Sequence, residues 1–184
     1  MQYVLASASP RRKELLKQLL PNFEIIVSDV DESGIHISVS EQLACGLAEA
    51  KCSAVFANNK DKTVIAADTI VVYNGRVLGK PANKNDAFQT LKMLSGNVHE
   101  VITGVCVQSP FKKVVGFEKT FVKFNILSDK FIKNYVEGGS PMDKAGSYGI
   151  QDKGVVCDYK GSYSNVVGLP IGLTRKLLEA AGKH

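Results

Sequence analysis

Three cations stand together in Ser9-Pro10-Arg11-Arg12-Lys13, directly after a short apolar segment at residues 3–6. Ser9 is a favoured N-cap and Pro10 suits the first helical position, so this spacing predicts that a strand runs into a helix here. The free N–H groups of a helix start favour an anion, whereas cations in the first turn oppose the helix dipole. We therefore expect this turn to bind phosphate. A solvated basic helix start is the alternative interpretation.

Carboxylates gather in a second loop, where Asp29, Asp31 and Glu32 follow the predicted strand 23–27. Hard divalent cations bind oxygen ligands of this kind. A magnesium ion that is carried by phosphates needs only one or two protein carboxylates. The loop is therefore a candidate metal site, with a solvated acidic loop as the alternative.

Asp68 is the one carboxylate in an apolar segment, residues 63–73, which predicts a strand buried on both faces. A buried charge is costly, so Asp68 must meet a cation, a metal or a cleft. Asn74-Gly75 predicts a two-residue hairpin turn, and the register counted back from it places Thr69 opposite Lys80. Asp68 and Lys80 should therefore lie together. They would form a structural ion pair, or a site in which the carboxylate holds a metal or orients water beside phosphate.

A helix is predicted over residues 40–57. Its expected core stripe consists of Leu43, Leu47, Ala50 and Ala54. Lys51 lies at the shoulder of this stripe. Its ammonium group could remain in water or reach into a neighbouring cleft.

The other periodic segments predict the remaining elements. Helices are expected at residues 10–20, 85–94, from 128 and from 170, and strands at 101–107, 114–126 and 155–159. Core side chains are expected at Phe117, Phe121, Val122, Phe124 and Ile126. Two loops rich in glycine and short polar residues, 140–152 and 161–170, offer groups that could cradle a ligand. Flexible surface loops are the alternative.

Composition limits the classes of function. The chain has 184 residues, 45% of them hydrophobic, and a net charge of +5. This charge suits a polyanionic ligand, but it is too diffuse to indicate nucleic acid by itself. No apolar segment approaches the length of a membrane span, and no signal-peptide pattern occurs. The four cysteines show no C-x-x-C spacing, which favours a reduced, cytoplasmic protein, and the three histidines are scattered, which argues against a zinc site.

Five motifs carry a resemblance to a known family: SASPRR at 7–12, AADT at 66–69, GKP at 79–81, DKAGSYGIQ at 143–151 and GSYSNVVGLP at 161–170. Together, between residues 3 and 178, they resemble the Maf family of septum-formation inhibitors and nucleoside triphosphate pyrophosphatases. The resemblance implies one domain over residues 1–184. Its fold would be a two-lobed α/β fold with a long twisted mixed sheet and a central cleft, as in inosine triphosphate pyrophosphatases.

The resemblance also implies a reaction and its site. The family cleaves the α–β phosphoanhydride of a nucleotide with a divalent cation, Mg²⁺ or Mn²⁺, and usually forms a homodimer. The implied catalytic residues are Asp68, Lys80 and Arg12. The implied substrate-binding residues are Ser7, Arg11, Arg12, Lys51, Thr69 and Gln151. The implied metal ligands are Asp68 and Glu32, with Asp31 as the rival of Glu32.

Three positions, Arg12, Thr69 and Gln151, match the branch of the family that acts on dTTP and UTP. An amide such as that of Gln151 can meet the donor–acceptor edge of uracil or thymine. A pyrophosphatase for 7-methyl-GTP or another modified nucleotide is one alternative, and a non-catalytic regulator of septum formation is another. Stable binding of nucleic acid is not expected, because the chain lacks interleaved aromatic and basic residues and its groove carboxylates would repel phosphate.

Overall fold

The structure, a computed structural model, describes residues 2–31, 35 and 38–182. The strands are β1 (Tyr3–Leu5), β2 (Glu24–Ile25), β3 (Thr63–Tyr73), β4 (Arg76–Leu78), β5 (Val98–Gln108), β6 (Lys113–Phe124) and β7 (Val156–Lys160). The α-helices are α1 (Pro10–Lys17), α2 (Ser40–Phe56), α3 (Lys84–Leu94), α4 (Asp129–Glu137), α5 (Tyr163–Val167) and α6 (Ile171–Gly182). Two 3-10 helices, η2 (Ser140–Asp143) and η3 (Ala145–Ser147), lie between α4 and β7.

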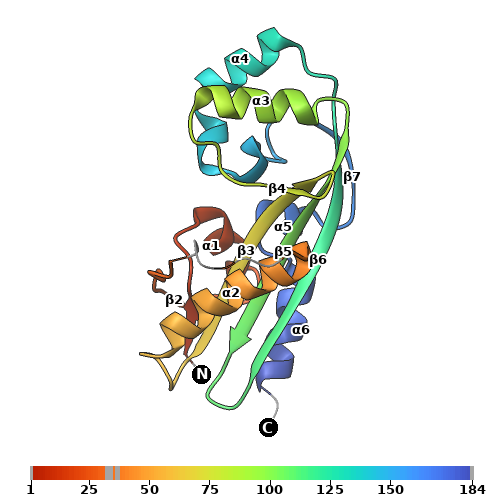
Figure 1. The fold of residues 1–184 in the computed structure, drawn as a ribbon. Coiled ribbons are helices and arrows are strands. Elements are labelled where there is room, and N and C mark those ends of the chain that lie inside the picture. Colours follow the sequence, from red (N-terminus) through yellow and green to blue (C-terminus); the bar gives the residue numbers. More distant parts are fainter. Residues whose placement is uncertain (1, 32–34, 36–37, 183–184) are drawn as a thin grey trace.

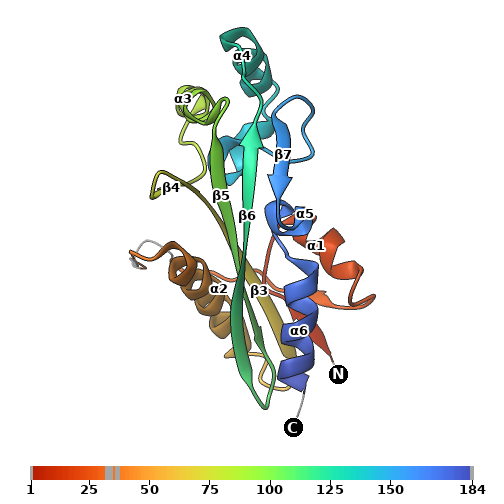
Figure 2. The ribbon, with the colours of Figure 1, turned by 90° about the vertical axis from the view of Figure 1, so that its right-hand side faces the viewer.

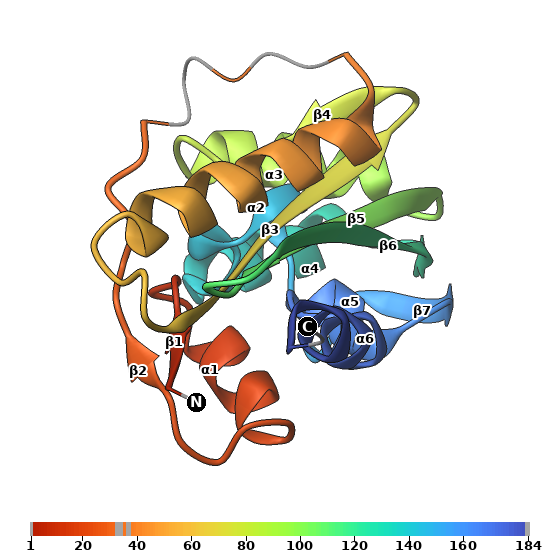
Figure 3. The ribbon, with the colours of Figure 1, turned by 90° about the horizontal axis from the view of Figure 1, so that it is seen from below.

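These strands form one mixed sheet in the order β2-β1-β3-β5-β6-β7, with β4 paired to β3 (Figure 1). The two N-terminal strands pair in parallel, and the strands from β3 onward pair antiparallel. The long β5–β6 ribbon runs through the molecule, with α3 and α4 gathered at one end (Figure 2). At the other end α2 covers one face of the sheet, whereas α6 lies on the opposite face (Figure 3). The predicted two-lobed α/β fold is confirmed.

The site is placed by a gap along one edge of β3. On this side β1 pairs with residues 63–65, and β4 pairs with residues 71–73. Residues 66–70 therefore have no strand partner on this edge within the described part of the chain. The other edge of β3 is paired with β5 throughout residues 64–72. Asp68 and Thr69 lie in the middle of the gap, where a ligand can reach them.

The buried face of α2 differs from the predicted stripe. The buried residues are Ala44, Leu47, Ala48, Cys52 and Val55. Leu43 and Ala50 are only half-buried, and Ala54 is exposed. The helix is rotated so that small residues face the sheet, which it approaches very closely. A Cβ atom placed on Gly104 of β5 would lie 2.2 Å from the carbonyl oxygen of Ala44.

The predicted core of β6 is partly wrong. Val122 and Phe124 are buried, but Phe117, Phe121 and Ile126 are 48%, 43% and 91% exposed. Alternate side chains of a strand face opposite sides of the sheet. Phe117 and Phe121 lie on the face opposite to Val122 and Phe124, and Ile126 lies beyond the end of the strand. Apolar type alone could not assign these faces.

Several boundaries also differ from the prediction. The first helix ends at Lys17 rather than near residue 20, the second strand is only Glu24–Ile25, and α5 was not predicted. All four cysteines are free, as their spacing suggested. Among the described residues, no helix has both the length and the apolar character needed to cross a membrane.

Candidate active site

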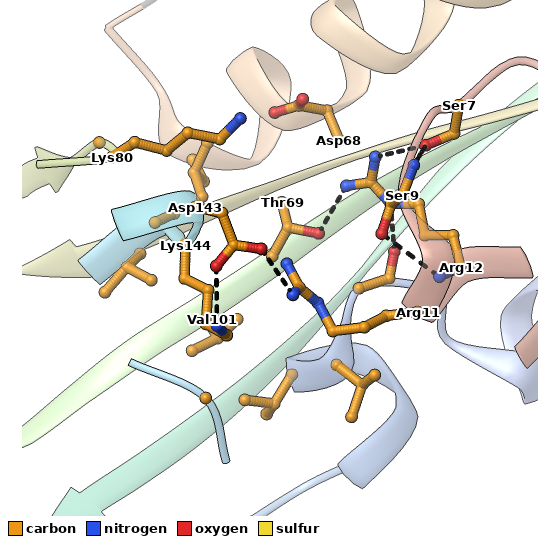
Figure 4. A pocket seen from close by; sticks show the side chains of 18 of the residues that line it. Ser7, Ser9, Arg11, Arg12, Asp68, Thr69, Lys80, Val101, Asp143 and Lys144 are labelled. Atoms are coloured by element: carbon orange, nitrogen blue, oxygen red, sulfur yellow. Dashed lines mark hydrogen bonds and ion pairs between the residues drawn. The ribbon is translucent and has the colours of Figure 1, made fainter. Parts of the chain in front are cut away.

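A pocket of about 700 Å³ lies beside the open edge of β3. It is lined by the β1–α1 loop, α2, the end of the β3–β4 hairpin, residues 143–151 and the end of α5 (Figure 4). Its volume is within the range of small-molecule sites. Eight of the predicted site residues line it, namely Ser7, Arg11, Arg12, Lys51, Asp68, Thr69, Lys80 and Gln151.

The predicted acidic loop lies partly outside the described residues. Glu32 lies outside the described residues. Asp31 is exposed, and it is not among the described residues that line the pocket. Lys13, the third cation of the helix start, is also exposed and lies outside this lining.

Asp68 is paired with Lys51. The Lys51 Nζ atom lies 2.5 Å from Asp68 Oδ1, and both side chains are more than four-fifths buried, at 14% and 13% exposure. Lys51 therefore reaches into the cleft, which was one of its two predicted positions. A short charge-assisted hydrogen bond in a partly desolvated pocket holds the Asp68 carboxylate in one orientation.

Lys80 occupies a different position from the one predicted. The hairpin register is correct at Tyr73 and Arg76, but the ladder ends where Val71 pairs with Leu78. Lys80 is therefore beyond the strand, and it is exposed. Its side chain extends over the pocket (Figure 4), while the ion-pair partner of Asp68 comes from α2.

Arg12 ties three segments together. Its Nε donates to the carbonyl of Gly168 over 2.8 Å, and its Nη2 donates to Thr69 Oγ1 over 3.1 Å. Its Nη1 donates to Ser7 Oγ over 3.3 Å. The backbone N–H of Arg12 donates to Ser9 Oγ, which confirms Ser9 as the N-cap. These contacts hold the guanidinium at the junction of the β1–α1 loop, β3 and α5.

A chain of hydrogen bonds that the sequence analysis did not predict continues from Thr69, the residue that Arg12 contacts. Thr69 Oγ1 and Thr103 Oγ1 are 3.0 Å apart, and Thr103 Oγ1 donates to the carbonyl of Asn165 over 2.9 Å. Because that carbonyl can only accept, Thr69 must donate to Thr103. Thr103 and Asn165 are fully buried. The motif that contains Asn165 could have drawn attention to it, but Thr103 is identified only through the β3–β5 register.

Arg11 meets a carboxylate from the other lobe. Its Nη1 atom lies 2.9 Å from Asp143 Oδ2, and Lys144 Nζ lies 2.7 Å from Asp143 Oδ1. Partial burial raises the pKa of Asp143, but hydrogen bonds from Lys144 and Arg11 outweigh this effect and lower that pKa to about 2. Asp143 is therefore ionised at neutral pH, and it was not among the predicted site residues.

Tyr148 lines the pocket, and contacts with His99 and Phe124 hold its ring in position. Its hydroxyl lies 2.7 Å from His99 Nε2, and both rings contact Phe124 edge to face. Burial lowers the pKa of His99 to about 4, so the imidazole is neutral at neutral pH. Burial also raises the pKa of Tyr148. This part of the pocket is therefore uncharged.

The exposed Gln151 belongs to a loop that Asp152 anchors. Asp152 Oδ2 accepts from the Gly149 N–H over 3.2 Å and from Ser140 Oγ over 2.9 Å. It also accepts from the hydroxyl of Tyr135. Three donors on one oxygen hold the loop that presents Gln151 to the pocket.

Asp68 is a pocket residue that could contribute an oxygen ligand to a divalent cation. The described residues contain no cluster of three or more histidine, cysteine, aspartate or glutamate side chains that could hold an ion. Both oxygens of Asp143 contact cations, whereas Lys51 contacts one oxygen of Asp68. A phosphate-carried Mg²⁺ needs only one or two carboxylates, which Asp68 can supply in part.

Comparisons with known proteins identify the family. Residues 2–181 match the family described as Maf-like protein. A dTTP/UTP pyrophosphatase of Bacillus cereus (strain G9842) is 49% identical over 177 residues, which are 95% of this chain and 93% of the relative. A dTTP/UTP pyrophosphatase of Bacillus anthracis is 50% identical over the same shares of the two chains.

Two solved structures share the fold. The Ham1 protein of Staphylococcus aureus has a TM-score of 0.53 at 18% identity, over 98% of this chain and 99% of that one. A HAM1 protein of Coxiella burnetii has a TM-score of 0.52 at 15% identity, over 98% and 100% of the two chains. At these identities the similarity concerns the fold alone.

Proposed function

The chain belongs to the Maf family, and we propose that it is a nucleoside triphosphate pyrophosphatase that converts dTTP and UTP into the monophosphate and pyrophosphate. One observation carries the proposal: a largely buried Asp68–Lys51 pair borders a pocket that is also lined by Arg11, Arg12 and Lys80. Phosphoryl chemistry needs such an arrangement, in which one carboxylate faces water and several cations face developing negative charge. Both lobes line the pocket, so we assign the activity to a single domain, residues 1–184.

Asp68 is the proposed general base. Lys51 holds its carboxylate in place, so that the carboxylate can orient a water molecule and accept its proton. The water oxygen forms a bond to the α-phosphorus, the bond to the bridging oxygen breaks, and pyrophosphate leaves with the electron pair. Lys51 and Lys80 stabilise the charge that spreads over the phosphate oxygens. Loss of one such group typically costs about 3 kcal/mol of transition-state stabilisation.

A divalent cation, Mg²⁺ or Mn²⁺, is part of the proposal. Asp68 would hold it together with the substrate phosphates, and Glu32 is the proposed second carboxylate, with Asp31 as its rival. When bound, the ion supplies Lewis-acid stabilisation of phosphate charge.

The other predicted residues divide between the two ends of the nucleotide. Ser7 and Arg11 belong to the phosphate end, together with Arg12, which we propose as a positioned cation because protein acceptors hold its guanidinium. Gln151 lines the same pocket as Tyr148, and its amide can pair with the donor–acceptor edge of uracil or thymine. Thr69 lines the same pocket and is the remaining proposed substrate-binding residue.

Pyrophosphate release from a nucleotide panel tests the proposal. The panel contains dTTP, UTP, CTP, GTP, 7-methyl-GTP and ITP, each with Mg²⁺, Mn²⁺ or a chelator. Wild type is compared with Asp68→Asn and with the control Asp158→Asn, which alters an exposed aspartate of β7. Metal-dependent release from dTTP and UTP, lost in Asp68→Asn alone, is expected.

Other outcomes of this panel have distinct meanings. A preference for 7-methyl-GTP or ITP would retain the reaction and overturn the assignment of Arg12, Thr69 and Gln151 to pyrimidine selection. Normal rates in Asp68→Asn would remove Asp68 from the chemistry. Tight nucleotide binding without release from any substrate would favour a non-catalytic regulator of septum formation.

The proposed assembly is a homodimer in the cytoplasm. Phe117 and Phe121 leave an exposed apolar surface on one face of β6, where a second copy can pack. Four free cysteines suit a reducing compartment. Light scattering on the purified chain tests the dimer, and a monomeric mass at micromolar concentration would contradict it.

A further inference from the structure

The pocket contains a carboxylate that phosphate binding does not explain. Asp143 ends η2, lines the pocket, and is 62% exposed. It contacts Arg11 on one side and Lys144 on the other. Figure 4 shows the Asp143 and Arg11 side chains pointing toward each other, one from η2 and the other from the first turn of α1. A negative charge therefore stands where a polyanionic substrate is expected to bind.

The contact resembles the one that a phosphate would make. A guanidinium group donates to carboxylate and phosphate oxygens in the same way. The Arg11 Nη1 atom is 2.9 Å from Asp143 Oδ2, which is an ordinary charge-assisted hydrogen bond. Asp143 thus supplies Arg11 with an anionic partner from the protein itself, 132 residues away in the sequence.

Asp143 keeps a second partner when it releases Arg11. Lys144 lies 2.7 Å from the other carboxylate oxygen. The Lys144 ammonium also donates to the carbonyl of Ser140, which anchors it to η2. Arg11 can therefore exchange Asp143 for a phosphate while the Asp143 charge stays neutralised.

We propose that Asp143 is an internal competitor of the substrate. Its carboxylate occupies Arg11 in the free protein, and the triphosphate must displace it in order to bind. The inference rests on the proposed function, because that function makes a polyphosphate the displacing ligand. Ligands with several negative charges displace Asp143 readily, whereas singly charged anions do not. Asp143 thereby favours polyphosphates over smaller anions.

A role in folding stability alone would not explain the contact between Arg11 and Asp143. The Arg11 and Asp143 side chains are 29% and 62% exposed, and exposed ion pairs contribute little to folding stability. The contact matters more for a ligand, because Asp143 occupies the guanidinium that a phosphate would otherwise bind. Removal of the Asp143 charge should therefore tighten phosphate binding while it leaves the fold intact.

The test measures the binding of inorganic pyrophosphate by calorimetry, with no turnover required. Wild type is compared with Asp143→Asn and with Glu137→Gln, a matched control that breaks the exposed Lys84–Glu137 pair of the same lobe. Asp143→Asn should lower the Kd for pyrophosphate about two- to fivefold, the factor that corresponds to an exposed ion pair. Glu137→Gln should leave that Kd unchanged. The KM for dTTP should fall by a similar factor in Asp143→Asn.

A double-mutant cycle makes the test specific to Arg11. If Asp143 competes for Arg11, the tightening caused by Asp143→Asn must disappear in an Arg11→Ala background. An unchanged or weaker Kd for pyrophosphate in Asp143→Asn would overturn the proposal and make Asp143 a residue that positions Arg11. Tighter pyrophosphate binding without hydrolysis of any nucleotide would keep the competitor and reject the proposed pyrophosphatase function.

Discussion

Gly104 allows Asp68, the proposed general base, to meet Lys51. It pairs with Asp68 across β3 and β5, and its missing side chain leaves room for α2, the helix that carries Lys51. A Cβ atom at this position would lie 2.2 Å from the carbonyl oxygen of Ala44 and 2.6 Å from the backbone nitrogen of Cys45. Gly104→Ala therefore forces a backbone out of position, because these obstacles are not the ends of flexible side chains.

The expected magnitude follows from these distances. Carbon and oxygen atoms approach no closer than about 3.3 Å in ordinary contacts, so α2 must retreat by roughly 1 Å. Overpacking of a close-packed interior costs about 1–3 kcal/mol, and we expect the upper part of this range. The same shift separates Lys51 from Asp68, which are 2.5 Å apart in the structure. Misplacement of a catalytic group by about 1 Å can reduce kcat roughly a hundredfold.

Urea denaturation and dTTP turnover measure the two effects on the same preparations. Gly172→Ala is the matched control, because a Cβ atom there meets nothing within 4 Å and the residue lies in α6. That variant should be neutral or more stable by about 0.5–1 kcal/mol, since alanine favours helix over glycine. If Gly104→Ala matched wild type in both stability and kcat, the close approach of α2 would not matter, and the reasoning would fail.

Two further predictions concern buried polar groups. The pKa of His99 is lowered from 6.5 to about 4 in the folded protein, so the unfolded chain binds more protons between these pH values. The free energy of unfolding should therefore fall by up to about 3 kcal/mol as the pH drops from 6.5 to 4. Urea titrations of wild type and His99→Leu over this pH range measure the effect. The same pH dependence of stability in both proteins would contradict it. Thr103→Val leaves Thr69 without an acceptor and the Asn165 carbonyl without that donor, at a cost of about 1–3 kcal/mol. Thr103→Ser should restore most of this stability in urea denaturation, and equal stability of both variants would count against the hydrogen-bond chain.

The start of a helix and the position of a tight turn could be predicted from the sequence, because both depend on residues that are neighbours in the chain. Ser9 and Pro10 determine where α1 begins, and the structure shows the expected cap. Asn74 and Gly75 have φ angles of 50° and 75°, which a tight hairpin turn needs and which these two residue types tolerate. The motifs that contain Asp68, Lys80 and Gln151 likewise predicted which residues line the pocket.

The choice of partners depended on tertiary structure. The sequence by itself required that Asp68 meet a cation, a metal or a cleft, since an unpaired buried carboxylate is costly. It could not select Lys51 over Lys80, because that choice depends on the rotation of α2 and on the residue where β4 ends. The contact between Thr69 and Thr103 depends in the same way on strand register. The contact between Arg11 and Asp143 depends on the approach of the two lobes. Such contacts join residues far apart in the chain, and only the packing of the sheet and its helices brings them within hydrogen-bond distance.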